Sequence, residues 1–399
     1  MAAFWEKIHA LDKQSRYAQE IELLRLRLLE MPNDKFSSWR LGDVLRKVGQ
    51  VEEAERLLLA LCGPSEPRRV WLTTALAETY RQKGELEQAR RWFIKATELR
   101  PETTGPWIYL GGFYLTCGRN EQARAVLKRG LQAEGDVDEV HVNLGHCYRA
   151  EGDHGAAAYH YREALKMDPE DAETRECVED CRAASGVAGA IRRKQKLLIE
   201  KGSGIATFKR RVARARRRGH HSYTIELLRL YLEAKPSDAS AAQALGNALR
   251  IVGRYNEAEQ ILLALPDLLE PGYGLAAVSI GELYHQKGRL ADAHAWFLKA
   301  TELQPECTEP WLHLGEFYLL RGKSDLARSA LENGLRARGD IDEVHVCLGN
   351  CYRAVAAYQT AICHYREAIN IDPGAEDAWH GLADCEAALT VRENAPRGA

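Results

Sequence analysis

The sequence predicts an all-α fold, an α-solenoid built from stacked helical hairpins. Three observations lead to this prediction. A pattern recurs about every 34 residues, apolar residues inside each pattern lie three or four positions apart, and a glycine divides each pattern into two halves. Spacings of three and four residues indicate helices with one buried face. The glycine indicates a tight turn, so each unit is a helix, a turn and a second helix.

The composition suits a chain that buries a core. Of the 399 residues, 45% are apolar and 28% are charged, which is not typical of disorder. The net charge of −2 predicts neither a nucleic-acid nor a membrane partner from bulk charge. No run of 18 apolar residues is present, and the first residues lack the pattern of a secretory signal. The 10 scattered cysteines favour reduced thiols and a cytoplasmic location.

The repeat can be followed from its clearest members. Residues 106–114 align with residues 140–148 after a shift of 34, and the register extends back to Ala77 and, with one extra residue, to Gly42. Each unit has a glycine at the turn, namely Gly49, Gly84, Gly118 and Gly152. A small residue and a large apolar residue follow at fixed distances: Ala54 and Leu58, Ala89 and Phe93, Ala123 and Leu127, Ala157 and Tyr161. Small residues let the two helices approach closely, and large ones fill the gap between layers.

This pattern resembles the tetratricopeptide repeat (TPR) family. The residues that carry the resemblance are Trp107, Leu110, Gly111, Tyr114, Gly118, Ala123 and Leu127, and again Trp311, Leu314, Gly315, Tyr318, Gly322, Ala327 and Leu331. The resemblance implies a right-handed superhelix of helix–turn–helix repeats. It also implies a concave surface, lined by the first helix of each repeat, on which extended peptides bind.

A second symmetry overlies the first, because residues match others 204 positions later. Ile21–Arg25 matches Ile225–Arg229, and roughly half of the positions between 77 and 169 are identical to their counterparts. We therefore expect six repeats in residues 1–204, the sixth degenerate, and five repeats with a C-terminal capping helix in residues 205–399. Because 204 is six times 34 and Gly186 falls at a turn position, one continuous superhelix is expected. The alternative is two solenoids hinged near residues 201–204.

The sequence predicts neither an enzyme nor a bound cofactor. Residues 321–324 read Arg-Gly-Lys-Ser, like the end of a phosphate-binding loop, but Phe317 stands where that loop needs its first glycine. The pairs Cys177 with Cys181 and Cys347 with Cys351 have the spacing of metal ligands on one helix face. Other repeats carry apolar or small residues at those places, so we expect buried core cysteines and no metal.

The family resemblance assigns a peptide-binding groove to the first helices. In chain order its residues are Trp39, Arg40, Asp43, Arg46, Lys47, Glu78, Arg81, Tyr109, Asn143, His146, Arg149, Asn247, Arg250, Glu282, His285, His313, Glu316, Asn350 and Arg353. Polar residues at places that packing does not require suggest recognition. The expected function is a non-catalytic scaffold or adaptor for a protein or peptide partner whose identity the sequence does not give.

One ligand of the family is not expected. Domains that bind chaperone C-termini hold the terminal carboxylate with a fixed set of lysine, asparagine and arginine residues across three repeats. Asn143 could be the middle member, but Ile108, Gly112 and Glu176 break the set. We therefore expect no chaperone carboxylate clamp.

The segment 192–218 gives the alternative function, which is binding of nucleic acid or of an acidic partner. It holds 12 lysines and arginines against one acid, Glu200. Four of the basic residues occupy groove positions: Lys209, Arg210, Arg216 and Arg217. Glu173, Glu176 and Asp180 of the preceding repeat could simply neutralise them. Only Phe208 and Tyr223 offer aromatic rings, so stacking on single-stranded nucleic acid has little support.

Overall fold

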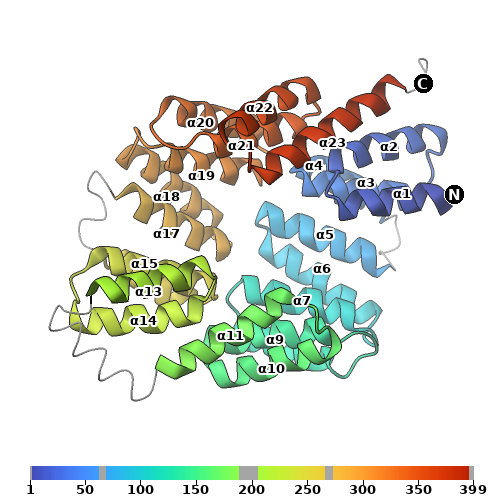
Figure 1. Ribbon diagram of the computed structural model, residues 1–399. Coiled ribbons are helices and arrows are strands. Elements are labelled where there is room, and N and C mark those ends of the chain that lie inside the picture. Colours follow the sequence, from blue (N-terminus) through green and yellow to red (C-terminus); the bar gives the residue numbers. More distant parts are fainter. Residues whose placement is uncertain (1, 63–68, 188–204, 266–272, 395–399) are drawn as a thin grey trace. The chain divides into compact units, whose positions relative to one another are not determined.

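The described residues form an all-α structure, as the sequence predicts. The computed structural model describes residues 2–62, 69–187, 205–265 and 273–394 (Figure 1). Helices of the first copy are α1 (Ala2–Lys13), α2 (Tyr17–Glu30), α3 (Lys35–Lys47), α4 (Val51–Ala60), α5 (Val70–Lys83), α6 (Leu86–Leu99), α7 (Thr104–Thr116), α8 (Asn120–Gly130), α9 (Asp138–Glu151), α10 (His154–Met167) and α11 (Ala172–Val187). Helices of the second copy are α13 (Ile205–Arg217), α14 (His221–Ala234), α15 (Ala239–Ile251), α16 (Tyr255–Leu263), α17 (Gly274–Gln286), α18 (Leu290–Leu303), α19 (Thr308–Leu319), α20 (Ser324–Arg336), α21 (Asp342–Ala354), α22 (Tyr358–Ile371) and α23 (Glu376–Glu393).

The helices pack in consecutive pairs, which are the hairpins of the repeat. Examples are α3 with α4, α7 with α8, α9 with α10 and α21 with α22. Within the α7–α8 pair, Leu127 is fully buried against Gly111, where a Cβ atom would lie only 2.5 Å from a leucine methyl carbon. The glycine is therefore required for the close approach of the two helices. Gly152 ends α9 with a φ of 82°, a conformation that favours glycine.

The chain forms two compact units, each assembled from both sequence copies. The first unit contains Met1–Trp92 and Phe297–Ala399, and the second contains Phe93–Trp296. The boundaries after Trp92 and Trp296 are themselves 204 residues apart. Each unit therefore joins the start of one copy to the end of the other.

Corresponding helices make the join in each unit. In the first unit the last helix, α23, packs on α2, and in the second unit α11 packs on α14. These two contacts correspond at the 204-residue offset. Gly186, expected at a turn, lies within α11, whose helix continues to Val187. The second helix expected for this repeat and the expected hinge at 201–204 lie outside the described residues.

A buried aspartate secures each join. Asp384 on α23 accepts hydrogen bonds from the backbone N–H groups of Ala18 (2.9 Å) and Gln19 (3.0 Å). Asp180 on α11 accepts the equivalent bonds from Ser222 and Tyr223, both at 2.9 Å. The first turn of a helix has unpaired N–H groups and a positive potential, so a carboxylate stabilises it. The last described helix of each copy thus carries an aspartate that caps a helix of the other copy.

Candidate functional site

The expected groove residues lie on the first helices of the hairpins and are divided between the two units. In the first unit they are Trp39, Arg40, Asp43, Arg46 and Lys47 on α3, Glu78 and Arg81 on α5, His313 and Glu316 on α19, and Asn350 and Arg353 on α21. In the second unit they are Tyr109 on α7, Asn143, His146 and Arg149 on α9, Asn247 and Arg250 on α15, and Glu282 and His285 on α17. The basic residues Lys209, Arg210, Arg216 and Arg217 are all exposed on α13.

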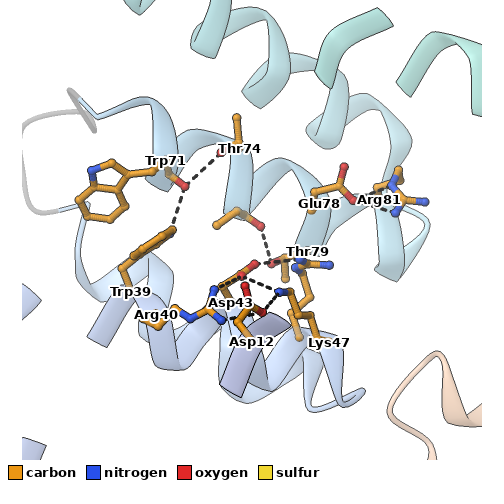
Figure 2. A network of polar contacts seen from close by, with 12 residues as sticks. Asp12, Trp39, Arg40, Asp43, Lys47, Trp71, Thr74, Glu78, Thr79 and Arg81 are labelled. Carbon is orange, nitrogen blue, oxygen red and sulfur yellow. Dashed lines mark hydrogen bonds and ion pairs between the residues drawn. The ribbon is translucent and has the colours of Figure 1, made fainter. Parts of the chain in front are cut away.

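An ion network fills the corner between α1 and α3 in the first unit (Figure 2). Arg40 donates to Asp12 at 2.7 Å and to the fully buried Glu20 at 2.5 Å. Lys47 also pairs with Asp12, at 2.8 Å. Asp43 completes the network by pairing with Arg46 at 2.8 Å and with Arg40 at 3.4 Å. Three carboxylates thus meet three cations.

The pKa shifts in this network follow from burial and from the pairing. Burial acts to raise the pKa of Asp12, but hydrogen bonds from Lys47 and Arg40 outweigh it and leave the pKa below its ordinary value. Burial raises the pKa of Glu20, with Arg40 opposing the rise. These side chains pair with one another, so Arg40 and Lys47 have a structural role in this corner.

Trp39 also has a structural role. Its indole N–H donates to the backbone carbonyl of Trp71 at 3.1 Å, and the two ring centroids lie 4.9 Å apart. Phe36 packs against Trp39 at 5.0 Å and against Trp5 at 4.5 Å. Phe36 remains 43% exposed, so the aromatic cluster reaches the surface.

The other groove arginines have different partners. Arg81 pairs with Glu78 of its own helix at 2.7 Å, whereas Arg250 pairs with Glu282 of the next repeat, also at 2.7 Å. Arg353 contacts the capping carboxylate of Asp384 at 3.2 Å. Arg149 is largely buried, and its guanidinium lies 3.6 Å from the sulfur of Cys177. Of these side chains, Arg81 is the most exposed.

A small pocket lies beside α7 and α9 in the second unit. Its volume is about 280 Å³, and it is lined by Leu115 and Thr116 of α7, by Asn143, His146 and Arg149 of α9, and by residues 251–253 and Tyr255 of the α15–α16 turn. Burial lowers the pKa of His146 to about 3, and Arg149 acts in the same direction. The neutral imidazole Nδ1 lies 2.7 Å from the hydroxyl of Tyr161. Predicted groove residues of the first copy thus meet a turn of the second copy.

A larger pocket of about 580 Å³ lies between α13 and α15. Its lining residues are Ala213, Arg216, Arg217, His221, Ala244, Asn247, Ala248 and Ile251. A smaller cavity of about 190 Å³ adjoins it and shares Ala213, Arg216 and Ala244. Burial lowers the pKa of His221; the negative charge of Asp180 opposes this effect, and the positive charges of Arg149, Arg216 and Arg250 add to it. Residues 192–204 of the predicted basic segment lie outside the described residues.

The cysteines with ligand-like spacing do not gather into a metal site within the described ranges. Cys181, Cys347 and Cys351 are buried, and burial raises the pKa of the Cys181 thiol to about 12. One group with metal-ligand chemistry occurs among the described residues: Glu176, Glu179 and His220. The imidazole of His220 is 2.9 Å from the carboxylate of Glu176, which accounts for that contact as a hydrogen bond.

Sequence reasoning missed the joins and the filled corner. Asp384 and Ala18 are 366 positions apart, and nothing local marks their contact. The 204-residue alignment did contain a signal, because Asp180 and Asp384 are the same residue at the same offset. The alignment also places Asp12 opposite Arg216, a charge reversal inside an otherwise shared pattern.

Comparison with protein families gives three matches, all of them tetratricopeptide repeat models. One matches residues 139–171, a second matches residues 74–103, and a third matches residues 244–306 and 279–343. The matches fall in both sequence copies and in both units. They agree with the repeat described above.

Two curated proteins and one solved structure illustrate the similarity. Superkiller complex protein 3 of Mus musculus is 25% identical over 297 residues, which is 71% of this chain and 18% of that protein. Protein O-mannosyl-transferase TMTC1 of Homo sapiens is 25% identical over 205 residues, 50% of this chain and 23% of that protein. A thermophilic TPR protein of Thermus thermophilus covers 45% of this chain and 97% of its own, with 26% identity and a TM-score of 0.41. The chain spans about a fifth of the length of these two curated relatives.

Within the described ranges, every helix is too short or too polar to cross a membrane.

Proposed function

We propose, from the premise that this chain is a tetratricopeptide repeat protein, that it is a non-catalytic scaffold holding protein partners on the first helices of its repeats. Proteins of the family to which it belongs are typically interaction scaffolds. We assign none of the relatives' complexes or activities to this chain, because it spans about a fifth of their length.

The pocket beside α7 and α9 is the observation that carries the proposal. The side chains of Asn143 and His146 gather in one concave place, where His146 also contacts Tyr161 of the second helix. A volume of about 280 Å³ lies just below the range of roughly 300–1,000 Å³ common for small-molecule sites. It suits a single side chain of an extended segment, which is how peptide grooves obtain specificity. The exposed aromatic ring of Tyr109 on α7 adds a surface for apolar contact.

The chemistry of this pocket supports binding rather than catalysis. A general base works best with a pKa near the operating pH. Burial instead lowers the pKa of His146 to about 3, so the imidazole stays neutral at pH 7. Burial also raises the pKa of the Cys147 thiol to about 12, which removes it as a nucleophile. Both groups are suited to packing and hydrogen bonding.

Capture of partners from native cell lysate tests the proposal with two matched tyrosines. Tyr109 lies on a first helix and is 50% exposed, whereas Tyr159 lies on a second helix and is 56% exposed. We expect the proteins captured by the parent chain to be lost by Tyr109→Ala and kept by Tyr159→Ala, as quantified by mass spectrometry. Loss with Tyr159→Ala alone would place the binding surface on the second helices and contradict the proposal.

A further inference from the structure

The second sequence copy carries an open cationic pocket where the first copy carries the closed ion network. Asp12 of the network corresponds to Arg216, 204 residues later. Arg40 corresponds to Ala244, and Lys47 corresponds to Ile251. The helices keep their places, since α1 matches α13 and α3 matches α15. The side chains at these three positions differ between the two copies in both size and charge.

The change in size makes the space. In the first copy the long side chain of Arg40 reaches across to Asp12 and Glu20. Alanine at position 244 leaves that volume empty, and the 580 Å³ pocket occupies it. The adjoining 190 Å³ cavity extends along α13 toward Phe208 and Lys209, next to Ser240. In the first copy the counterpart of Ser240, Phe36, lines a pocket of about 670 Å³ together with Trp5 and Arg27. Together the two cavities of the second copy form a trough between α13 and α15.

The change in charge leaves the trough positive. Arg216 and Arg217 are exposed, and within the described residues no carboxylate forms an ion pair with either. Two acids of α11 have other contacts, because Asp180 caps α14 and Glu176 contacts His220. Glu173 and Glu179 of the same helix are exposed. Asp238, the acid that lines the smaller cavity, caps α15 and accepts a bond from Tyr231. Arg216 and Arg217 therefore have no ion-pair partner among the described residues, while the charge of Asp238 acts on Lys209.

A polar atom in the pocket also lacks a partner. The Oδ1 atom of Asn247 is buried, and among the described residues nothing donates a hydrogen bond to its side-chain oxygen. Buried polar atoms normally have partners, and an amide can present either its oxygen or its NH₂ group. Its counterpart in the first copy, Asp43, pairs with Arg40 and Arg46. A bound group can supply the contact that the protein does not.

We propose that the trough between α13 and α15 binds an acidic, extended segment of a partner protein, with a carboxylate held by Arg216 and Arg217 and an amide contact from Asn247. This inference rests on the proposed function and names its partner chemistry. Arginine guanidinium groups bind carboxylates through paired hydrogen bonds. Ala213, Ala248 and Ile251 provide an apolar wall for the methylene groups of the acidic side chain and its neighbours.

The composition of the trough favours a peptide over nucleic acid. Proteins that bind single strands stack bases on exposed aromatic rings. Of the rings that line the trough, Phe208 and Tyr231 are buried and stack on each other with centroids 5.2 Å apart, and the imidazole of His221 is half-buried. The phenyl ring of Phe208 and the phenol ring of Tyr231 are therefore not exposed for a base to stack on, whereas a pocket with apolar walls suits a side chain.

A peptide library tests the inference on the full chain. Extended peptides with a fixed central Glu are compared with the same library fixed at Gln, using the parent chain, Arg216→Ala and the matched control Lys13→Ala. Lys13 is the first-copy counterpart of Arg217. We expect selection of the Glu library by the parent and by Lys13→Ala, and about a tenfold loss of affinity with Arg216→Ala.

Three outcomes would overturn the inference. Peptide binding with no preference for Glu would contradict it while leaving the proposed function intact. A Glu preference that survives in Arg216→Ala would place the carboxylate elsewhere. Binding of a mixed-sequence single-stranded RNA that requires Arg216, with no binding of either library, would assign the trough to phosphate groups and would also count against the proposed function.

Discussion

The corner between α1 and α3 and the corner between α13 and α15 have the same backbone plan and opposite surface chemistry. In the first, three carboxylates and three cations neutralise one another around Arg40. In the second, Arg216 and Arg217 line a pocket in which Ala244 and Ile251 stand at the positions of Arg40 and Lys47. Both corners keep their helices, so the ion network is not required for the fold.

Comparing the two copies distinguishes residues that the fold requires from surface residues that can differ between the copies. The capping aspartates Asp180 and Asp384 are identical in both copies and sit at the joins. The groups at 12 and 216, and at 40 and 244, differ in charge or size. Duplicated repeats of this kind allow one copy to have an ion network at the place where the other has a cationic pocket.

The largest expected effect concerns the joins. Asp384→Ala removes the cap of α2 and leaves Arg353 without its 3.2 Å partner. We expect the free energy of unfolding to fall by about 3 kcal/mol, because breaking a buried pair leaves an uncompensated charge. Asp180→Ala should cost less, about 2 kcal/mol, since no described residue forms an ion pair with that aspartate as Arg353 does with Asp384. Urea titrations of both variants, followed by circular dichroism, measure the difference; equal losses would show that Arg353 adds nothing.

The second effect concerns pH. His146 lies beside the hydroxyl of Tyr161, and its counterpart Asn350 accepts a hydrogen bond from Tyr365 at 2.8 Å. Because burial lowers the His146 pKa to about 3, the folded state favours the neutral imidazole. Its stabilising contribution is present above the unfolded pKa near 6.5 and is lost as the pH falls below that value toward 3.

His146→Asn copies the second-copy residue and should remove this dependence. Between pH 7 and pH 5 we expect the parent to lose up to about 2 kcal/mol more stability than the variant. Denaturant titrations at several pH values give the two curves. Parallel curves would show that the pKa of His146 in the folded chain stays near its unfolded value and would contradict this expectation.

The third effect tests the two corners directly. Asp12→Ala leaves Arg40 and Lys47 facing each other with one carboxylate fewer, and should cost about 1 kcal/mol. Arg216→Ala removes an exposed group without an ion-pair partner among the described residues, and should change stability by less than about 0.5 kcal/mol. Thermal unfolding of the two variants provides the comparison. A larger loss for Arg216→Ala would make that arginine a structural residue and weaken its assignment to binding.

The smallest effect concerns a turn. Ala356 has a φ of 58° at the place where Gly152 has a φ of 82°. A left-handed conformation is unfavourable for alanine and accessible to glycine. Ala356→Gly should therefore raise the free energy of unfolding by up to about 1 kcal/mol. If urea titration shows a loss instead, the second-copy turn has contacts that compensate for the strain.

The fold could be predicted from sequence because its determinants are local and repeated. Gly111 and Leu127 lie within one hairpin, and the same pair recurs at Gly315 and Leu331. The joins could not be predicted in this way, since Asp384 and Ala18 are far apart in the chain and only the folded helices bring them together. The groove positions were available from the repeat register. The partners of the groove side chains could not be predicted, because they come from neighbouring helices, as Asp12 and Glu20 do for Arg40.

Rebuilding the first-copy network in the second copy tests the central claim most directly. Arg216→Asp, Ala244→Arg, Asn247→Asp and Ile251→Lys together copy Asp12, Arg40, Asp43 and Lys47. We expect this variant to unfold at nearly the same temperature as the parent and no longer to select peptides with a central Glu. A rebuilt chain that still prefers Glu over Gln as strongly as the parent would show that the trough between α13 and α15 is not the binding site.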